Sequence, residues 1–204
     1  MPSKQPQRQL SVLNLAHSFL RSHVHTGDLC IDATAGRGFD TAVLCELVGD
    51  EGKVLAFDIQ QDAVDSTKQL LAEKGFSNAE VHLDSHAHLA EYAENGSVSC
   101  IVFNFGWLPR GSHEIYTHAD SSIAALNAGL KLLKVGGAMS LCIYYGGANG
   151  FSERDALLDY FKTLDSTYYT VLQCQFPNRT GCPPFVVFIT KDAQPPESQT
   201  EAES

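Results

Sequence analysis

A chain of 204 residues with 44% hydrophobic side chains is long enough to bury one sizeable core and short for two domains. Its formal net charge of −10 excludes a protein that holds nucleic acid mainly through a broad basic surface. The six cysteines form no C-x-x-C pair and lie among apolar residues, so the pattern predicts reduced, buried thiols rather than a disulfide framework or a zinc knuckle.

Both ends of the chain are polar. The first nine residues lack the apolar run of a secretory signal, and no later segment approaches the roughly 18 uninterrupted apolar residues that a membrane helix needs. The residues after Asp192 are Pro, Ser, Gln and Glu with nothing to bury. We therefore expect a cytoplasmic protein with no membrane segment, with a tail over residues 1–9, one domain over residues 10–191 and a disordered acidic tail over residues 192–204.

Helical and strand patterns alternate along the domain. The first half predicts, in order, a helix over residues 10–25, a strand at "LCIDA", a helix over 40–48, a strand at "KVLAFD", a helix over 61–74, a strand at "AEVHL" and a short helix over 88–93. The second half predicts a buried strand at "SCIVFNF", a helix over 121–133 that the double glycine ends, a strand at "AMSLCIYY", a helix over 153–164, and two strands at "YYTVLQCQF" and "PFVVFIT".

Alternating strands and helices indicate parallel strands joined by right-handed crossovers, with helices on both faces of the sheet. The last two strands have only the short connection "PNRTGCP" between them, so they pair antiparallel at one edge. The sequence predicts an α/β, Rossmann-like fold with a seven-stranded, mostly parallel sheet and a C-terminal antiparallel hairpin. This is the plan of class I methyltransferases.

The first strand leads into "DATAGRGFD", residues 32–40, where an open parallel sheet binds its ligand. A nucleoside triphosphate requires G-x-x-x-x-G-K-[ST], and no such Lys-Ser/Thr pair follows Gly36 or Gly38. A dinucleotide requires a third small residue, and Thr41 stands at that position. The P-loop is excluded and the dinucleotide fingerprint is incomplete.

S-adenosylmethionine has no phosphate and carries an ammonium, a carboxylate and a sulfonium. A carboxylate at Asp32 suits the cationic methionine end and would repel a pyrophosphate, while Gly36 and Gly38 let the backbone approach closely. Asp58 ends the next strand, where it can accept from both ribose hydroxyls. The order of strand, acid, turn, helix and second acid favours this cofactor over the alternative that the two acids only cap their loops.

The segment "DSHAH", residues 84–88, follows the third strand, where an adenine edge would lie. We interpret Asp84 as an acceptor for the adenine amino group. The alternative is a metal cluster with His82, but neither cysteine nor a second carboxylate stands at ligand spacing, so no metal is expected.

A second loop, "VFNFGWLPRGSHEIYT", leaves the fourth strand beside the expected position of the methyl group. Asn104, the aromatic residues Phe105 and Trp107, and Pro109 are similar to the N-P-P-Y type loop of amino-methyltransferases, in a different order. An asparagine carbonyl can accept from an amine and so direct its lone pair at the methyl carbon. The alternative is that Asn104 only ends the strand and the aromatic residues are core.

Together these motifs resemble a family of bacterial methyltransferases formerly described as rRNA methylases and now associated with tRNA 5-(aminomethyl)-2-thiouridine methylation. The resemblance covers about residues 10–191 and rests on "DATAGRGFDT", "AFDIQ", "DSH", "FNFGWLPRGSHEIYT", "IYYGGANGF" and "CPPFVVFI". It implies S-adenosylmethionine as cofactor, bound by His17, Asp32, Thr34, Gly36, Gly38, Asp40, Thr41, Asp58, Ile59, Gln60, Asp84, Ser85 and His86. Arg37 and Arg110 depart from the family pattern.

The resemblance also implies methyl transfer to the primary amine of a 5-aminomethyl group on the wobble uridine, with the tRNA anticodon loop as partner. Asn104 is expected to orient the amine, and Tyr144, Tyr145 or His113 to pass its proton outward, without a choice among them. The substrate side is expected to consist of Trp107, Pro109, Arg110, Tyr145, Asn178 and Arg179, with Trp107 stacking on a base.

Other functions stay open to different degrees. Methylation of rRNA or of a small-molecule amine remains, because the cofactor half of the fold says nothing about the acceptor. An NAD-dependent oxidoreductase would need a Tyr-x-x-x-Lys pair, which this chain lacks. A non-catalytic adenosine-ligand binder would not need the second loop. The sequence does not set the oligomeric state, and a homodimer is compatible with it.

Overall fold

The computed structural model describes residues 10–106, 119–146 and 150–196. These residues form one seven-stranded sheet in the order β3-β2-β1-β4-β5-β7-β6. Its strands are β1 (Leu29–Asp32), β2 (Lys53–Asp58), β3 (Ala79–Leu83), β4 (Val98–Phe105), β5 (Leu133–Ile143), β6 (Tyr169–Cys174) and β7 (Phe185–Lys191). The helices are α1 (Val12–His23), α2 (Phe39–Val48), α3 (Gln61–Lys74), the 3₁₀ helix η1 (His86–Glu91), α4 (Ala119–Leu132) and α5 (Gly150–Thr163).

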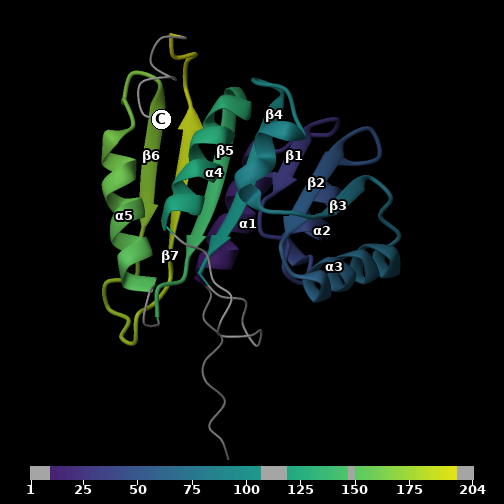
Figure 1. The fold of residues 1–204 in the computed structure, drawn as a ribbon, viewed down its shortest axis with the longest axis horizontal. Helices are drawn as coiled ribbons and strands as arrows, with labels where there is room; N and C mark the ends of the chain where they lie inside the picture. Colours follow the sequence, from purple (N-terminus) through teal and green to yellow (C-terminus); the bar gives the residue numbers. More distant parts are fainter. Residues whose placement is uncertain (1–9, 107–118, 147–149, 197–204) are drawn as a thin grey trace, which may run out of the picture.

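The five strands from β3 to β5 pair in parallel, and β7 runs antiparallel between β5 and β6. The predicted mostly parallel sheet with a C-terminal antiparallel hairpin is therefore confirmed. Figure 1 shows this hairpin at one side of the molecule, with the yellow strand β7 pointing opposite to its neighbours. Strand order reverses between β1 and β4, and in such sheets the ligand lies beyond the carboxyl ends of the strands at that reversal.

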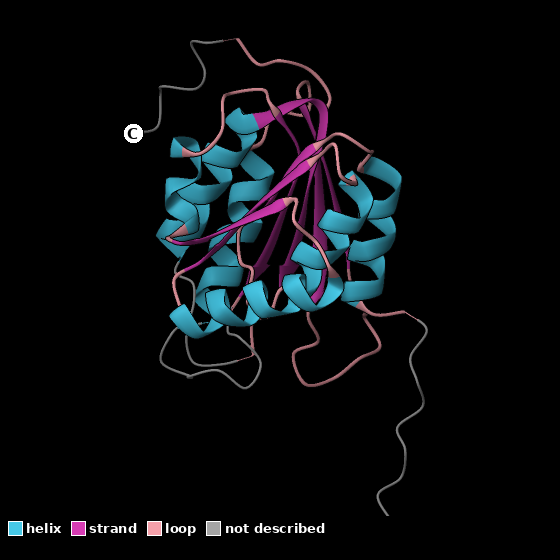
Figure 2. Ribbon diagram, turned by 90° about the vertical axis from the view of Figure 1, so that its right-hand side faces the viewer, coloured by secondary structure: helices cyan, strands magenta, loops and turns pink. Residues whose placement is uncertain are grey.

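Helices cover both faces of the sheet, as predicted (Figure 2). On one face η1, α4 and α5 pack against the strands around Phe57, Phe103 and Leu126. On the other face α1, α2 and α3 pack around Leu20, Leu44 and Val54. Because both faces are covered, β4 is buried along nearly its whole length, and Asn104 is a polar interruption close to its carboxyl end.

The predicted end of the fourth long helix at the double glycine is wrong. Helix α4 ends at Leu132, and β5 begins at once and runs through Gly136 and Gly137. The pairing of β4 with β5 shifts register between Val98 and Cys100 at this point. A Cβ on Gly137 would lie 3.0 Å from the carbonyl oxygen of Val98, so glycine permits a close strand contact here rather than ending a helix.

Smaller boundary shifts have local causes. The first helix begins at Val12 rather than residue 10, because Ser11 caps it by accepting from the Asn14 amide at 3.1 Å. The predicted short helix over 88–93 is the 3₁₀ helix over 86–91. All six cysteines are unpaired and four are buried, as expected. No described helix is both long and apolar enough to cross a bilayer.

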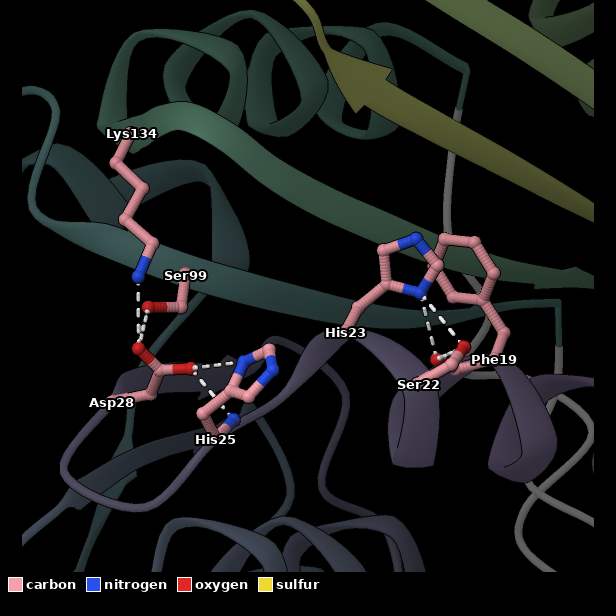
Figure 3. Close-up of polar contacts among 7 residues, drawn as sticks. All are labelled: Phe19, Ser22, His23, His25, Asp28, Ser99 and Lys134. Atoms are coloured by element: carbon pink, nitrogen blue, oxygen red, sulfur yellow. Dashed lines mark hydrogen bonds and ion pairs between the residues drawn. The ribbon is translucent and has the colours of Figure 1, made fainter.

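The amino edge of the sheet is held together by Asp28 (Figure 3). Its carboxylate accepts from the His25 amide at 2.8 Å, the Ser99 hydroxyl at 2.5 Å and the Lys134 ammonium at 2.8 Å. Burial alone would raise the pKa of Asp28, but these hydrogen bonds together lower it. The loop before β1 is thereby fixed to β4 and β5, at the edge opposite the glycine loop.

The chain after β7 starts with further contacts. Asp192 accepts hydrogen bonds from Thr170 at 2.5 Å and Thr190 at 2.7 Å. The predicted tail over 192–204 thus begins with a residue bound to the sheet, and residues 197–204 lie outside the described part of the chain.

Candidate active site

The glycine loop after β1 is tightly folded between β1, β2 and α3. Gly36 and Gly38 have φ of 54° and 79°, a region that favours glycine. The Gly36 amide donates to Asp58 Oδ2 at 2.9 Å, and its carbonyl accepts from the Thr67 hydroxyl at 3.2 Å. A Cβ on Gly38 would meet the Cα of Thr67 at 3.0 Å. Both backbone conformations therefore favour glycine, and Gly38 also permits the loop to pack closely on α3.

Asp32 lies fully buried beneath this loop. Its Oδ2 accepts from the Thr41 hydroxyl at 2.6 Å and its Oδ1 from the Thr34 amide at 3.2 Å. Burial, with the nearby charge of Asp40, raises the pKa of Asp32 despite these hydrogen bonds. The carboxylate thus supports the loop from below, in addition to the role toward a cationic ligand that the sequence predicts.

Asp58 ends β2 beside the loop. Its two oxygens accept from the amides of Gly36 and Gln60, each at 2.9 Å. Burial raises its pKa and these backbone amides oppose the rise. The next residue, Ile59, is 56% exposed, so an apolar surface lies next to the acid that is predicted to bind ribose.

The segment after β3 gives Asp84 three hydrogen-bond donors. It accepts from the Ser85 amide, His88 Nδ1 and the Tyr92 hydroxyl, each at 2.7 Å. The hydrogen bonds from Tyr92 and His88 lower the pKa of Asp84 to about 2. These donors come from η1 and the residues next to it, so Asp84 orients this helix. An adenine amino group would have to share the carboxylate with them.

His86, two residues after Asp84, has a buried ring nitrogen, Nε2, with no hydrogen-bond partner among the described residues. Only 9% of the residue is exposed, and its ring lies edge-on to Phe103 and Phe105. Burial lowers its pKa to about 4, so the ring is neutral near pH 7. A buried polar atom without a partner is a place where a ligand can supply the missing hydrogen bond.

Asn104 connects the glycine loop to the second predicted loop. Its amide N–H donates to the Thr34 hydroxyl at 2.7 Å, and its side-chain Nδ2 donates to Asp40 Oδ2 at 2.8 Å. The other oxygen of Asp40 lies 2.6 Å from His17 Nε2. The structure thus brings together four of the predicted site residues, from α1, the glycine loop, α2 and β4.

The two tyrosines after β5 differ in surroundings. The hydroxyl of Tyr144 is largely buried, and burial strongly raises its pKa, so it is a neutral phenol. Gly106 faces Tyr144, where a Cβ would lie 2.4 Å from the tyrosine carbonyl oxygen. Tyr145 packs instead against Phe151 and Phe185 on the other side of the sheet.

Part of the predicted substrate side lies beyond the hairpin strand β6. Arg179 places its guanidinium 3.4 Å from the centre of the Phe176 ring and donates to the carbonyl of Leu10 at 2.6 Å. Asn178 adjoins it in the same connection. The predicted residues Trp107, Pro109, Arg110 and His113 lie outside the described residues, and the ligand roles of all predicted site residues stay predictions.

Sequence reasoning missed one cluster at this edge. The Arg154 guanidinium lies 4.9 Å from the ring centres of both Tyr145 and Phe151. Phe151 belongs to the quoted "IYYGGANGF" segment, but the arginine three residues later had no motif to mark it. Within the described residues no group of three or more His, Cys, Asp or Glu side chains is placed to hold a metal ion.

Comparisons with known proteins agree with this arrangement. A family model described as "Putative rRNA methylase" matches residues 54–190. A tRNA (mnm(5)s(2)U34)-methyltransferase, chloroplastic, of Arabidopsis thaliana is 34% identical over 188 residues, which is 87% of this chain and 69% of the relative. The similarity therefore spans both the glycine loop and the second loop.

Solved structures show the same fold. A "putative rRNA-methylase" from Clostridium thermocellum superposes with a TM-score of 0.87 at 35% identity, covering 91% of this chain and all of the other. A "putative methyltransferase" from Streptococcus mutans, solved in complex with SAH, gives a TM-score of 0.81 at 33% identity, over 92% of this chain and 99% of the other. The Rossmann-like class I methyltransferase fold and the family resemblance are both confirmed, and the chain belongs to this family of rRNA methylase-like methyltransferases.

Proposed function

We propose that the protein uses S-adenosylmethionine to methylate the 5-aminomethyl group of wobble 5-aminomethyl-2-thiouridine in tRNA, giving 5-methylaminomethyl-2-thiouridine. The observation that supports an amine as the methyl acceptor is the fixed side-chain amide of Asn104, whose Nδ2 donates to Asp40. The observation that favours tRNA is the 34% identity to the Arabidopsis tRNA methyltransferase.

The described residues fit the cofactor. The backbone of Gly36 and Gly38 can approach a ligand, and Asp58 ends the strand beside this loop, a position from which an acid binds ribose hydroxyls in related sheets. The Nε2 of His86, which has no hydrogen-bond partner in the described part of the chain, and the exposed side chain of Ile59 suit an adenine ring. When bound, S-adenosylmethionine supplies an electrophilic methyl group.

The residues of this chain then have two tasks toward the acceptor. The first is orientation, because in-line displacement requires the amine nitrogen to point at the methyl carbon. Asn104 achieves this by accepting an amine N–H with its carbonyl oxygen. The second is to keep the amine unprotonated, and burial of the amine beside a positive charge lowers its pKa. Tyr144, a phenol that burial keeps neutral, is a candidate for moving the released proton outward.

RNA recognition in this proposal is local, because the chain is acidic overall. Tyr145, Asn178 and Arg179 contribute from the described part of the chain, together with Trp107, Pro109, Arg110 and His113 from the segment after β4. Aromatic and arginine side chains suit splayed bases, which an anticodon loop presents with little unstacking.

The test is transfer of labelled methyl from S-adenosylmethionine to tRNA that carries the unmethylated aminomethyl nucleoside, followed by nucleoside digestion. Label in 5-methylaminomethyl-2-thiouridine is the expected result, and tRNA that already carries the methylated nucleoside is the matched control. Label in rRNA but not in tRNA would favour the acceptor named by the family description. Absence of label with intact cofactor binding would overturn the tRNA assignment.

A further inference from the structure

Asp40 occupies the centre of a three-residue contact at the proposed methyl-transfer site. It lies in the first turn of α2, and its carboxylate is bound on one side by His17 of α1 and on the other by Asn104 of β4. The side chain of Asp40 is only 13% exposed and that of His17 is 29% exposed. The contact is therefore largely shielded from solvent and is most exposed at the histidine.

The chemistry of this contact fixes the direction of each hydrogen bond. An ionised carboxylate can only accept, so both partners must donate. His17 is thus held in a form with a proton on Nε2, at 2.6 Å from Asp40 Oδ1. Asn104 must turn its NH₂ group toward Asp40 Oδ2, at 2.8 Å. As a result the carbonyl oxygen of Asn104 points away from Asp40.

The main chain of Asn104 is fixed independently. Its amide N–H donates to the Thr34 hydroxyl at 2.7 Å, which ties β4 to the glycine loop. With the backbone held by Thr34 and the side-chain nitrogen held by Asp40, the amide has one orientation left. The oxygen and the NH₂ group of an amide have nearly the same shape, so without Asp40 they can exchange places. The NH₂ group would then face the acceptor amine and repel its N–H bonds.

We propose that Asp40 is a positioning residue for the acceptor amine, which acts through the Asn104 amide and is itself held by His17. The inference rests on the proposed function, because it assumes that Asn104 accepts from the amine. It assigns Asp40 to orientation of the acceptor, whereas the family resemblance places both Asp40 and His17 among residues that bind the cofactor. These assignments differ in what they predict for cofactor affinity.

The test measures methyl-transfer kinetics and S-adenosylmethionine affinity for Asp40→Ala, Asn104→Ala and the double variant. We expect Asp40→Ala to lower kcat for tRNA by up to about a hundredfold, the scale of a misplaced reacting group. Its dissociation constant for S-adenosylmethionine should change less than threefold. The double variant should be no slower than Asn104→Ala alone, because residues that act as a unit are not additive.

Two conservative variants separate orientation from loss of structure. Asp40→Asn keeps the shape of the side chain and one acceptor oxygen, and its NH₂ group can face His17 if that ring changes tautomer. It should therefore recover at least tenfold of the kcat that Asp40→Ala loses. His17→Gln retains an N–H donor and should be faster than His17→Ala. Recovery of this kind is not expected of residues that only hold the fold.

Glu46→Gln is the matched control. Glu46 lies on the same helix and also pairs with α1, through Arg21 at 3.7 Å, but its side chain is 61% exposed. This variant should keep wild-type kcat and cofactor affinity. Multiplying effects in the double variant, or a loss of cofactor affinity equal to the loss of kcat/KM, would show that Asp40 serves the cofactor and would overturn the inference. If the wild-type protein methylates no amine in tRNA, the proposed function fails first and the inference fails with it.

Discussion

Thr41 of α2 donates its hydroxyl hydrogen at 2.6 Å to Oδ2 of Asp32, the fully buried acid that ends β1 beneath the glycine loop. Threonine stands where a dinucleotide fold has a third small residue, and here its hydroxyl supplies one of the two hydrogen bonds that the Asp32 carboxylate receives from the described residues. The feature that distinguishes this loop from a dinucleotide fingerprint is therefore the feature that stabilises its buried acid.

Asp32→Asn should change how stability depends on pH. Because the pKa of Asp32 is raised in the folded state, the folded protein holds its proton more tightly than the unfolded chain does. The stability that this group contributes is complete below its unfolded pKa of about 4 and is lost as pH rises through the raised folded value. Urea unfolding should show the wild type losing stability relative to Asp32→Asn over that rise. A constant difference across pH would contradict the raised pKa.

Cofactor binding and turnover should separate between two variants. Asp32→Ala removes the support of the glycine loop and should abolish binding of S-adenosylmethionine, measured by calorimetry. Asn104→Ala leaves that loop intact and should keep binding while losing turnover. Normal turnover by Asn104→Ala would show that the acceptor amine is placed elsewhere.

The mostly parallel sheet with its terminal hairpin could be predicted because β4 and the strands beside it read as continuous apolar runs with glycine or acid at their ends. The glycine loop could be predicted for the same reason, since Asp32, Gly36, Gly38 and Asp58 stand at fixed places relative to two strands. These are local patterns. They place side chains at the carboxyl edge of a sheet without any knowledge of which side chains touch.

What the sequence did not reveal depends on contacts across the chain. The bonds from Asp40 to His17 and to Asn104 join residues 23 and 64 positions apart, and no local pattern connects them. The sequence also did not predict that β5 continues through Gly136 and Gly137. Glycine is needed at position 137 because the carbonyl oxygen of Val98 on β4 lies close to it, not because the chain turns there. In both cases the decisive neighbour lies on another element.

Asp28→Asn should destabilise the fold without affecting chemistry. Asp28 is 11% exposed and joins three segments at the amino edge, so its substitution leaves the buried Ser99 hydroxyl and the other two donors with a weaker partner, at a cost of about 1–3 kcal/mol. Since hydrogen bonds lower its folded pKa, this stability is present above the unfolded pKa of about 4 and is lost as pH falls through the folded value.

The matched control for this pair is Asp159→Asn. Asp159 is 2.8 Å from Lys162, the same kind of pair at the same distance as Asp28 with Lys134, but both side chains are more than 70% exposed. Denaturant unfolding should show little change for this variant. Equal losses in the two variants would mean that Asp28 contributes only as a surface charge.

Arg179→Gln should weaken RNA binding alone. Its guanidinium lies on Phe176 beside the start of α1, at the edge where the substrate is proposed to bind. We expect a higher KM for tRNA with an unchanged dissociation constant for S-adenosylmethionine, and a salt dependence of binding whose slope falls by about 1. Arg21→Gln, which removes an exposed arginine near the opposite end of α1, is the control. An equal change in both variants would indicate only a general effect of charge.

Gly38→Ala tests how closely the glycine loop must pack. The residue has φ of 79° and a new Cβ would lie 3.0 Å from the Cα of Thr67, so the variant suffers both backbone strain and a contact with α3 that cannot relax easily. Gly75→Ala is a close control, because its φ is 76° and no atom lies within 4 Å of the new Cβ. The control should cost about 1 kcal/mol of unfolding free energy, the ordinary strain of alanine at positive φ.

Gly38→Ala should cost more than this and should also weaken S-adenosylmethionine binding, because the loop must move away from α3 to make room for the alanine side chain. If the two variants lost equal stability and both bound the cofactor normally, the close contact with Thr67 would not be the reason for glycine at position 38. The loop would then be packed more loosely than its hydrogen bonds to Asp58 and Thr67 indicate.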